Sequence, residues 1–99
     1  MAGYGDYFSE HLRLTILRVL AEAPAYTSNS SILHSAANDL GLPATRDQIR
    51  TELSWLQEQR LITVQDAHGL AVVTLAERGL DAAEGRAHVP GIKRPAPRG

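Results

Sequence analysis

The stretch TRDQIRTELSWLQEQRLI, residues 45–62, combines a helix start, an amphipathic helix and a change of period. Thr45 and Gln48 have the spacing of a capping box, in which each side chain accepts the backbone amide of the other residue. Apolar residues then recur at a spacing that places them on one side of a helix: Ile49, Leu53 and Leu56. The stretch therefore predicts a helix over residues 45–59 that packs through one stripe and exposes a polar face.

A longer amphipathic helix is predicted from about Asp6 to Glu22, ended by Pro24, because proline disfavours helical geometry in the residue before it. One apolar stripe contains Phe8, Leu12, Ile16, Val19 and Leu20. A second, nearly opposite, contains Tyr7, Leu14, Leu17 and Ala21. A helix with two apolar sides is either sandwiched inside the core or paired with a second copy of the chain. The residues leave both arrangements open, so a homodimer is one expectation.

The segment YTSNSS, residues 26–31, is typical of a turn that caps a following helix, predicted from Ser30 to Leu40. Gly41 is a typical helix end. The inward residues expected on this helix are Ile32, Leu33, Ala36, Ala37 and Leu40. The short GLPAT connection to the helix over 45–59 requires the two helices to cross steeply, which is the geometry of a helix-turn-helix.

Beyond Arg60 the pattern becomes strand-like: LITVQ and LAVVTL are joined by DAHG, so a hairpin is expected with Gly69 at a positive φ. A last helix is predicted over residues 76–84, burying Leu80 and Ala83. The expected fold class is mainly α with a small β-hairpin, in the order α-α-α-β-β-α. Residues 1–85 form the predicted domain, and residues 86–99 an extended, basic Pro/Gly-rich tail with Val89 and Ile92 as anchors.

Composition excludes several classes of protein. The 99 residues suit one domain, and the absence of cysteine excludes disulfides and thiolate sites. Neither a secretory signal nor an apolar run of about 20 residues is visible, so a cytoplasmic protein without a membrane partner is expected. Residues 86–99 carry four Lys/Arg and no acid, whereas residues 1–85 carry six against eleven acids, which together give the net charge of −1. A mildly acidic body therefore carries a basic tail.

Two segments resemble a known family. IRTELSWLQEQRLI is similar to the recognition helix and first wing strand of ArsR-type and MarR-type regulators, and TLAERG, residues 74–79, resembles their Leu-Thr-x-x-Gly exit from the wing. The chain is also similar to small winged-helix proteins of Mu-like bacteriophages and prophages, in which a tail like VPGIKRPAP follows the last helix. This resemblance covers about residues 9–97 and implies a winged helix-turn-helix domain that regulates transcription. Arg60 stands where these families commonly have glycine.

The polar face of the helix over 45–59 is the expected DNA-binding surface, because Arg, Gln, Thr and Ser can hydrogen-bond bases or phosphates in the major groove. The candidate residues there are Arg46, Gln48, Arg50, Thr51 and Ser54, and the tail adds Lys93 and Arg94 as phosphate contacts. Asp47, Glu52 and Glu58 make this helix neutral through Arg60, as in an ordinary solvated helix. The tail has a second interpretation, folding back on the acidic residues Glu77, Asp81 and Glu84. Trp55 is expected to pack rather than to contact DNA.

No catalytic motif is present, and the four histidines are scattered, so neither an enzyme nor a metal or other cofactor is expected. The expected function is a small DNA-binding transcription regulator, with double-stranded DNA as its partner. The alternative is a winged-helix adaptor that binds a protein partner and no DNA, through the apolar side of the first helix or through the tail. The operator, the sign of regulation, any effector and the oligomeric state do not follow from the sequence.

Overall fold

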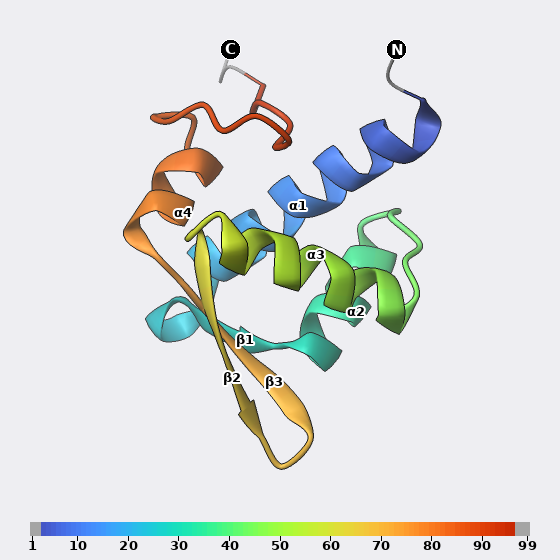
Figure 1. The fold of residues 1–99 in the computed structure, drawn as a ribbon, viewed down its shortest axis with the longest axis vertical. Helices are drawn as coiled ribbons and strands as arrows, with labels where there is room; N and C mark the ends of the chain where they lie inside the picture. The colour runs from blue at the N-terminus through green and yellow to red at the C-terminus, as the bar shows by residue number, and fades with distance from the viewer. Residues whose placement is uncertain (1–2, 97–99) are drawn as a thin grey trace.

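The structure, a computed structural model, describes residues 3–96 (Figure 1). Over these residues the chain forms four α-helices, one 3-10 helix and a three-stranded antiparallel sheet of order β1-β3-β2. In chain order the elements are α1 (Tyr4–Glu22), η1 (Pro24–Tyr26), β1 (Thr27–Asn29), α2 (Ser30–Asp39), α3 (Arg46–Glu58), β2 (Ile62–Ala67), β3 (Leu70–Leu75) and α4 (Glu77–Ala83). The fold is mixed α/β, and none of the described helices is long and apolar enough to cross a bilayer.

Strand β1 corrects the prediction that residues 26–31 form only a turn and a cap. Thr27, Ser28 and Asn29 pair with Thr74, Val73 and Val72 of β3. The hydroxyls of Thr27 and Thr74 are hydrogen-bonded at 3.1 Å. The cap was predicted correctly, since the Asn29 side chain accepts the amide of Ile32 at the start of α2. A polar strand of three residues has no periodicity of its own, and it forms here because β3 supplies a pairing partner far along the chain.

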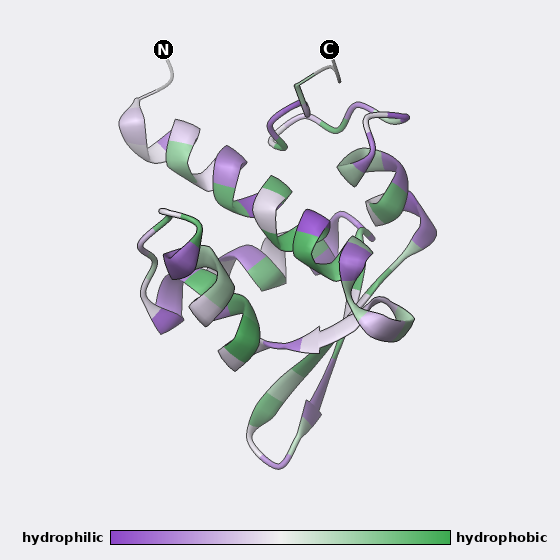
Figure 2. Ribbon diagram, turned by 180° about the vertical axis from the view of Figure 1, so that it is seen from behind, coloured by the Kyte–Doolittle hydropathy of each residue, from purple (hydrophilic) through white to green (hydrophobic). Residues whose placement is uncertain are grey.

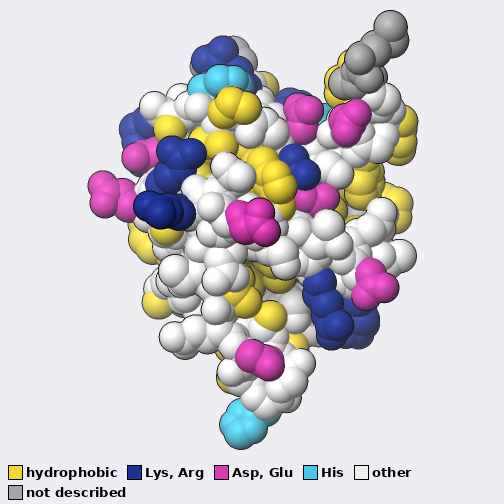
Figure 3. Space-filling view, viewed as in Figure 1, with side chains coloured by type: hydrophobic (Ala, Val, Ile, Leu, Met, Phe, Trp, Pro, Cys, Tyr) yellow, Lys and Arg dark blue, Asp and Glu magenta, His cyan; other side chains and the backbone are white. Residues whose placement is uncertain are grey.

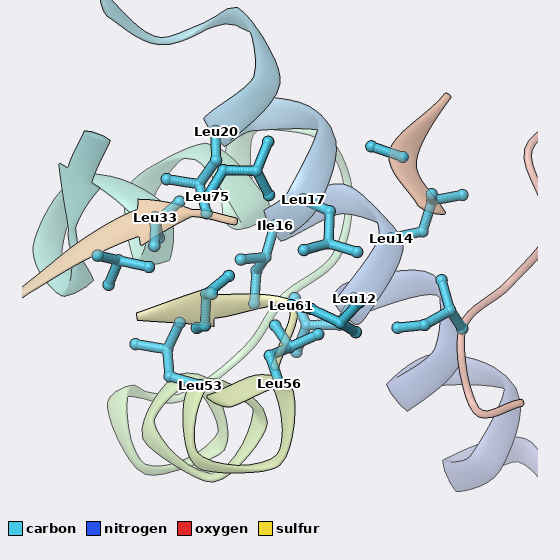
Figure 4. Packing of buried hydrophobic residues seen from close by; sticks show 14 of the residues in the cluster. Leu12, Leu14, Ile16, Leu17, Leu20, Leu33, Leu53, Leu56, Leu61 and Leu75 are labelled. Atoms are coloured by element: carbon cyan, nitrogen blue, oxygen red, sulfur yellow. The ribbon is translucent and has the colours of Figure 1, made fainter. Parts of the chain in front are cut away.

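Helix α1 is sandwiched in the core, with both apolar stripes covered. Leu12, Ile16 and Leu20 are buried from one side and Leu14 and Leu17 from the other. Helices α2 and α3 and strand β3 pack on α1, as does α4. In Figure 4, Leu14 lies apart from the α3 side chains Leu53 and Leu56. Of the stripe that suggested a homodimer, only Tyr7, at 59% exposure, is open to solvent, so Leu14 and Leu17 offer no surface to a second copy.

Helix α2 buries fewer residues than expected. Leu33 and Ala37 are in the core, whereas Ile32 is 55% exposed and Leu40 is 64% exposed. The prediction for these two residues was wrong because both lie at helix ends. Ile32 is in the first turn, and Leu40 follows the last helical residue, where the backbone turns toward Gly41 at φ 83°.

Helix α3 begins and ends as local sequence dictates. Thr45 and Gln48 form the predicted capping box. At the carboxyl end the amide of Arg60 donates to Gln57 O at 2.9 Å, and the amide of Leu61 donates to Leu56 O at 3.0 Å. This paired closure needs a left-handed residue, and Arg60 has φ 62°. Glycine is the usual residue there because a side chain costs roughly 1 kcal/mol in that conformation. Arg60 therefore carries a steric cost that glycine would not have at this position.

The predicted hairpin is present, with a tighter turn than expected. Strands β2 and β3 pair from Ile62 with Leu75 to Ala67 with Leu70, so only His68 and Gly69 lie in the turn. Both have positive φ, at 54° and 79°, as a two-residue hairpin turn requires. Asp66 and Ala67 thus belong to the strand instead of the loop.

After β3, α4 approaches the start of β2 very closely at Gly79. A Cβ added there would stand 2.1 Å from the Leu61 carbonyl oxygen and 2.7 Å from a methyl group of Leu75. The glycine of the TLAERG segment therefore permits contact between α4 and the backbone that leaves α3.

The tail packs against the domain. Val89 and Ile92 are buried in the common core, so both expected anchors are confirmed. The amide of Lys93 donates to the carbonyl of Glu10 in α1 at 3.3 Å. Residues 97–99, including Arg98, lie outside the described range.

Replacing Gly79 with alanine tests the close approach of α4 to the Leu61 carbonyl. Because the new methyl group would overlap backbone, we expect Gly79→Ala to lower the free energy of unfolding by about 3 kcal/mol or to prevent folding. The control is Gly5→Ala in α1, where nothing lies within 4 Å of the added Cβ. Gly5→Ala should stabilise by roughly 0.5–1 kcal/mol, since glycine is unfavourable in a helix. Urea denaturation measures both, and equal midpoints for the two variants would contradict the packing described.

Candidate functional site

The polar face of α3 is open to solvent. The five candidate residues on this helix are all exposed: Arg46, Gln48, Arg50, Thr51 and Ser54. They are held outward because Ile49, Leu53 and Leu56, on the other side, are buried against the core. Gln48 is partly committed, since its side-chain oxygen accepts the amide of Thr45 at 2.7 Å. Its side-chain NH₂ group keeps its donors for other partners.

Arg46 and Arg50 lie one helical turn apart and share a small hollow with Ser30 of α2. The hollow, about 20 Å³, is also lined by Ile49 and is the size of a single water molecule or oxygen atom. Within residues 3–96 neither arginine forms an ion pair with an acid. Figure 3 shows Lys and Arg side chains gathered over this end of α3. We call these two residues the Arg46–Arg50 pair.

Glu52 is on α3 but not on its exposed face. It is 6% exposed, and its carboxylate accepts a hydrogen bond from Arg13 Nε at 2.7 Å. The Arg13 guanidinium also donates to the Gly91 carbonyl at 2.9 Å and lies over the Trp55 ring, 4.0 Å from its centroid. A Cβ on Gly91 would come within 2.8 Å of that indole. We call Arg13, Glu52, Trp55 and Gly91 the tail latch, because they join α1, α3 and the tail. Trp55 therefore packs against the tail, as expected.

The tail latch changes the charge balance of the exposed face. The sequence counts three arginines against three acids from Thr45 to Arg60. Glu52 is withdrawn into the interior and paired with Arg13, which leaves Arg46, Arg50 and Arg60 against Asp47 and Glu58. The exposed charge of the segment is therefore plus one. The neutral sum of charges in the sequence from Thr45 to Arg60 favoured the interpretation of α3 as an ordinary solvated helix, and the exposed charge does not.

The tail cations are separate from the Arg46–Arg50 pair. The tail, which carries Lys93 and Arg94, runs along the top of Figure 1, whereas the amino end of α3 is at the lower right. Arg86 contacts Glu84 at 2.6 Å and Asp81 at 3.0 Å. The hydrogen bonds to Glu84 and then to Asp81 raise the pKa of Arg86 above its usual value. One of the tail charges is thus folded back on the acidic face of α4.

On the reverse side of the molecule there is an open groove of about 550 Å³ between the end of α1, β1 and the start of α2. Its apolar lining includes Val19, Pro24, Ile32 and Val72. Figure 2 shows hydrophobic colouring on the start of α2 and along β3 at this place. The groove was not foreseen, because it depends on the pairing of β1 with β3. Among residues 3–96 no cluster of three or more His, Asp or Glu side chains is arranged to hold a metal ion.

Comparison with known proteins gives a family. The chain is 46% identical over 93 residues to the uncharacterized protein gp26 of Escherichia phage Mu, covering 94% of this chain and 96% of the phage protein. The chain belongs to the gp26 family. It is also 37% identical over 78 residues to an uncharacterized protein of Haemophilus influenzae, covering 78% of this chain and 76% of that protein. No protein-family profile matches the chain, and no solved structure matches it significantly.

The expected likeness to a Mu-like phage protein is therefore confirmed at the level of the family. Since 93 of the 99 residues align, the gp26 similarity includes at least part of the tail. The tail is thus a shared part of these chains, consistent with Val89 and Ile92 lying in the core. Neither of these relatives supports the likeness to ArsR-type and MarR-type regulators.

The tail latch can be tested by removing its carboxylate. Glu52→Ala leaves the partly buried Arg13 guanidinium without its counterion, so we expect the free energy of unfolding to fall by about 3 kcal/mol. Glu58→Ala, on the exposed face of the same helix, should change it by less than about 0.5 kcal/mol. Both follow from urea denaturation. A loss at Glu52 no larger than at Glu58 would show that the pair contributes nothing to folding.

Proposed function

We propose that this gp26-family chain is a small DNA-binding protein, a transcription regulator of phage or prophage origin, that inserts α3 into the major groove. The observation that carries the proposal is the Arg46–Arg50 pair. Two arginines stand one turn apart on an exposed helix face, and neither is neutralised by an acid within residues 3–96. Guanidinium groups in such a position can bind guanine edges or phosphates.

The arrangement of elements supports a winged helix-turn-helix assignment. Helices α2 and α3 are in contact and are joined by a short connection that ends in the capping box of Thr45. The β2–β3 hairpin follows α3 directly, and β1 pairs with β3. This is the order of elements that the resemblance to ArsR-type and MarR-type regulators implies, with β1 added between the first two helices.

The hairpin turn is a weak part of the DNA-binding surface. The turn consists of His68 and Gly69 and has no Lys or Arg, and Asp66 lies in the adjoining strand. In this proposal α3 therefore supplies the main contacts, with Thr51 and Ser54 beside the Arg46–Arg50 pair. Lys93 and Arg94 add phosphate contacts only if DNA extends as far as the tail.

An adaptor function without DNA binding is the second candidate, and the reverse groove is the observation that favours it. Ile32, 55% exposed, lines that groove and could bury its side chain against an apolar segment of a protein partner. The apolar stripes of α1, by contrast, are covered except at Tyr7. The two candidates differ in one measurable property, the affinity for duplex DNA.

Binding of a fluorescent mixed-sequence duplex, measured at several salt concentrations, tests the proposal. We expect the wild-type chain to bind with a Kd below about 100 μM at low salt, in the range of non-specific DNA binding. Arg46→Ala combined with Arg50→Ala should weaken binding about tenfold or more and reduce the slope of log K against log salt by about two.

Arg18→Ala is the matched control, because Arg18 is an exposed arginine that belongs to α1 and not to α3. It should bind as the wild type does. If the wild-type chain shows no binding up to about 100 μM, the DNA-binding proposal is wrong and the adaptor candidate remains. If Arg18→Ala weakens binding as much as the double variant, α3 is not the contact surface.

A further inference from the structure

The carboxyl end of α3 carries an arginine in an unusual backbone conformation. Arg60 occupies the left-handed position that closes the helix, at φ 62°, where glycine would be unstrained. Its side chain is exposed and forms no ion pair within residues 3–96. Nothing in the packing requires an arginine here. A strained residue whose side chain has no structural partner is a reason to look for a binding role.

A second arginine reaches the same end of α3 from α4. Arg78 Nε donates a hydrogen bond to the carbonyl of Gln59, the residue next to Arg60, at 3.0 Å. This bond satisfies one of the free carbonyls at the end of α3 and places the Arg78 guanidinium beside the peptide bond between Gln59 and Arg60. The approach of α4 is possible because Gly79 lies directly against the Leu61 carbonyl. Arg60 and Arg78, 18 positions apart in the sequence, thus meet at the carboxyl end of α3, and we call them a cationic pair.

The charge of this pair depends also on the acids beside it in the sequence. Glu58 and Glu77 are its neighbours in sequence, and both are exposed. Within the part of the chain that the structure describes, neither forms an ion pair with Arg60 or Arg78. The two guanidinium groups therefore keep most of their donors for an external anion.

The two cationic pairs lie on the same side of the molecule. Figure 3 shows dark-blue side chains over both ends of α3, with magenta Asp and Glu side chains beside and between them. An α-helix of 13 residues is about 20 Å long, whereas the major groove is about 12 Å wide. When the polar middle of α3 is in the groove, its two ends therefore stand near the sugar-phosphate backbones that border it.

We propose that Arg60 and Arg78 form a second phosphate-binding pair, which contacts the DNA backbone at the opposite end of α3 from the Arg46–Arg50 pair. The inference rests on the proposed DNA-binding function and adds residues that the sequence did not indicate. A guanidinium group matches phosphate oxygens with two parallel hydrogen bonds. Phosphate contacts at both ends of a helix fix its position along the groove, while Thr51 and Ser54 remain for the bases.

Arg60→Gly separates DNA binding from folding, because the substitution should raise stability through the backbone and lower the affinity for DNA through loss of the side chain. Glycine relieves the left-handed strain, so the urea midpoint should rise. Loss of the guanidinium should nevertheless weaken duplex binding several-fold and reduce the salt slope by about one. If Arg60 only closes the helix, Arg60→Gly will raise the urea midpoint and leave duplex binding unchanged. That result would overturn the inference.

Arg78→Gln and Arg78→Lys complete the test with the full chain and the same mixed-sequence duplex. The glutamine variant should reduce the salt slope by about one, and the lysine variant, which keeps the charge, should keep the slope. Arg18→Gln is the control and should bind as the wild type does. If the wild type binds and the Arg46/Arg50 variant is weakened while Arg60→Gly and Arg78→Gln bind normally, this inference fails and the proposed function stands. If the wild type does not bind, both fail.

Discussion

The structure depends on the burial of α1 from both sides. Leu12, Ile16 and Leu20 face one set of elements, and Leu14 and Leu17 face another, so a single helix joins the rest of the chain into one core. In a chain of 99 residues without cysteine, stability must come from packing, and a helix with two apolar stripes packs against several elements at once. The position of α3 and the placement of the tail both follow from this helix.

Arg13 connects α1 to α3 and to the tail. One guanidinium pairs with Glu52, hydrogen-bonds Gly91 and covers Trp55, so α3 and the tail are fixed relative to each other. Pairing Glu52 internally also removes a negative charge from the helix whose arginines are exposed. A structural contact thus determines the electrostatic character of the candidate surface. Two groups around α3, the Arg46–Arg50 pair at its start and the pair of Arg60 and Arg78 at its end, are left without ion-pair partners among residues 3–96.

The similarity to gp26 of phage Mu over nearly the whole chain agrees with this integrated architecture. The tail contributes Val89 and Ile92 to the core and Gly91 to the latch, so its loss would expose apolar surface on α1. For the same reason, the tail lies away from the amino end of α3 (Figure 1).

Local patterns in the sequence determined the helices, the capping box at Thr45 and the β2–β3 hairpin, because hydrophobic periodicity and turn chemistry act between residues close in the chain. They also indicated Val89 and Ile92, since two apolar residues in a basic Pro/Gly-rich segment have few alternatives to burial. The helical spacing of Glu52 relative to Ile49, Leu53 and Leu56 also indicates that Glu52 lies next to the buried side of α3. Burial of its carboxylate requires a counterion, which Arg13 provides. Tertiary structure alone decided the pairing of β1 with β3, the covering of Leu14 and Leu17, and the meeting of Arg78 with the end of α3. Each of these depends on contacts between distant segments, whose geometry no local pattern encodes.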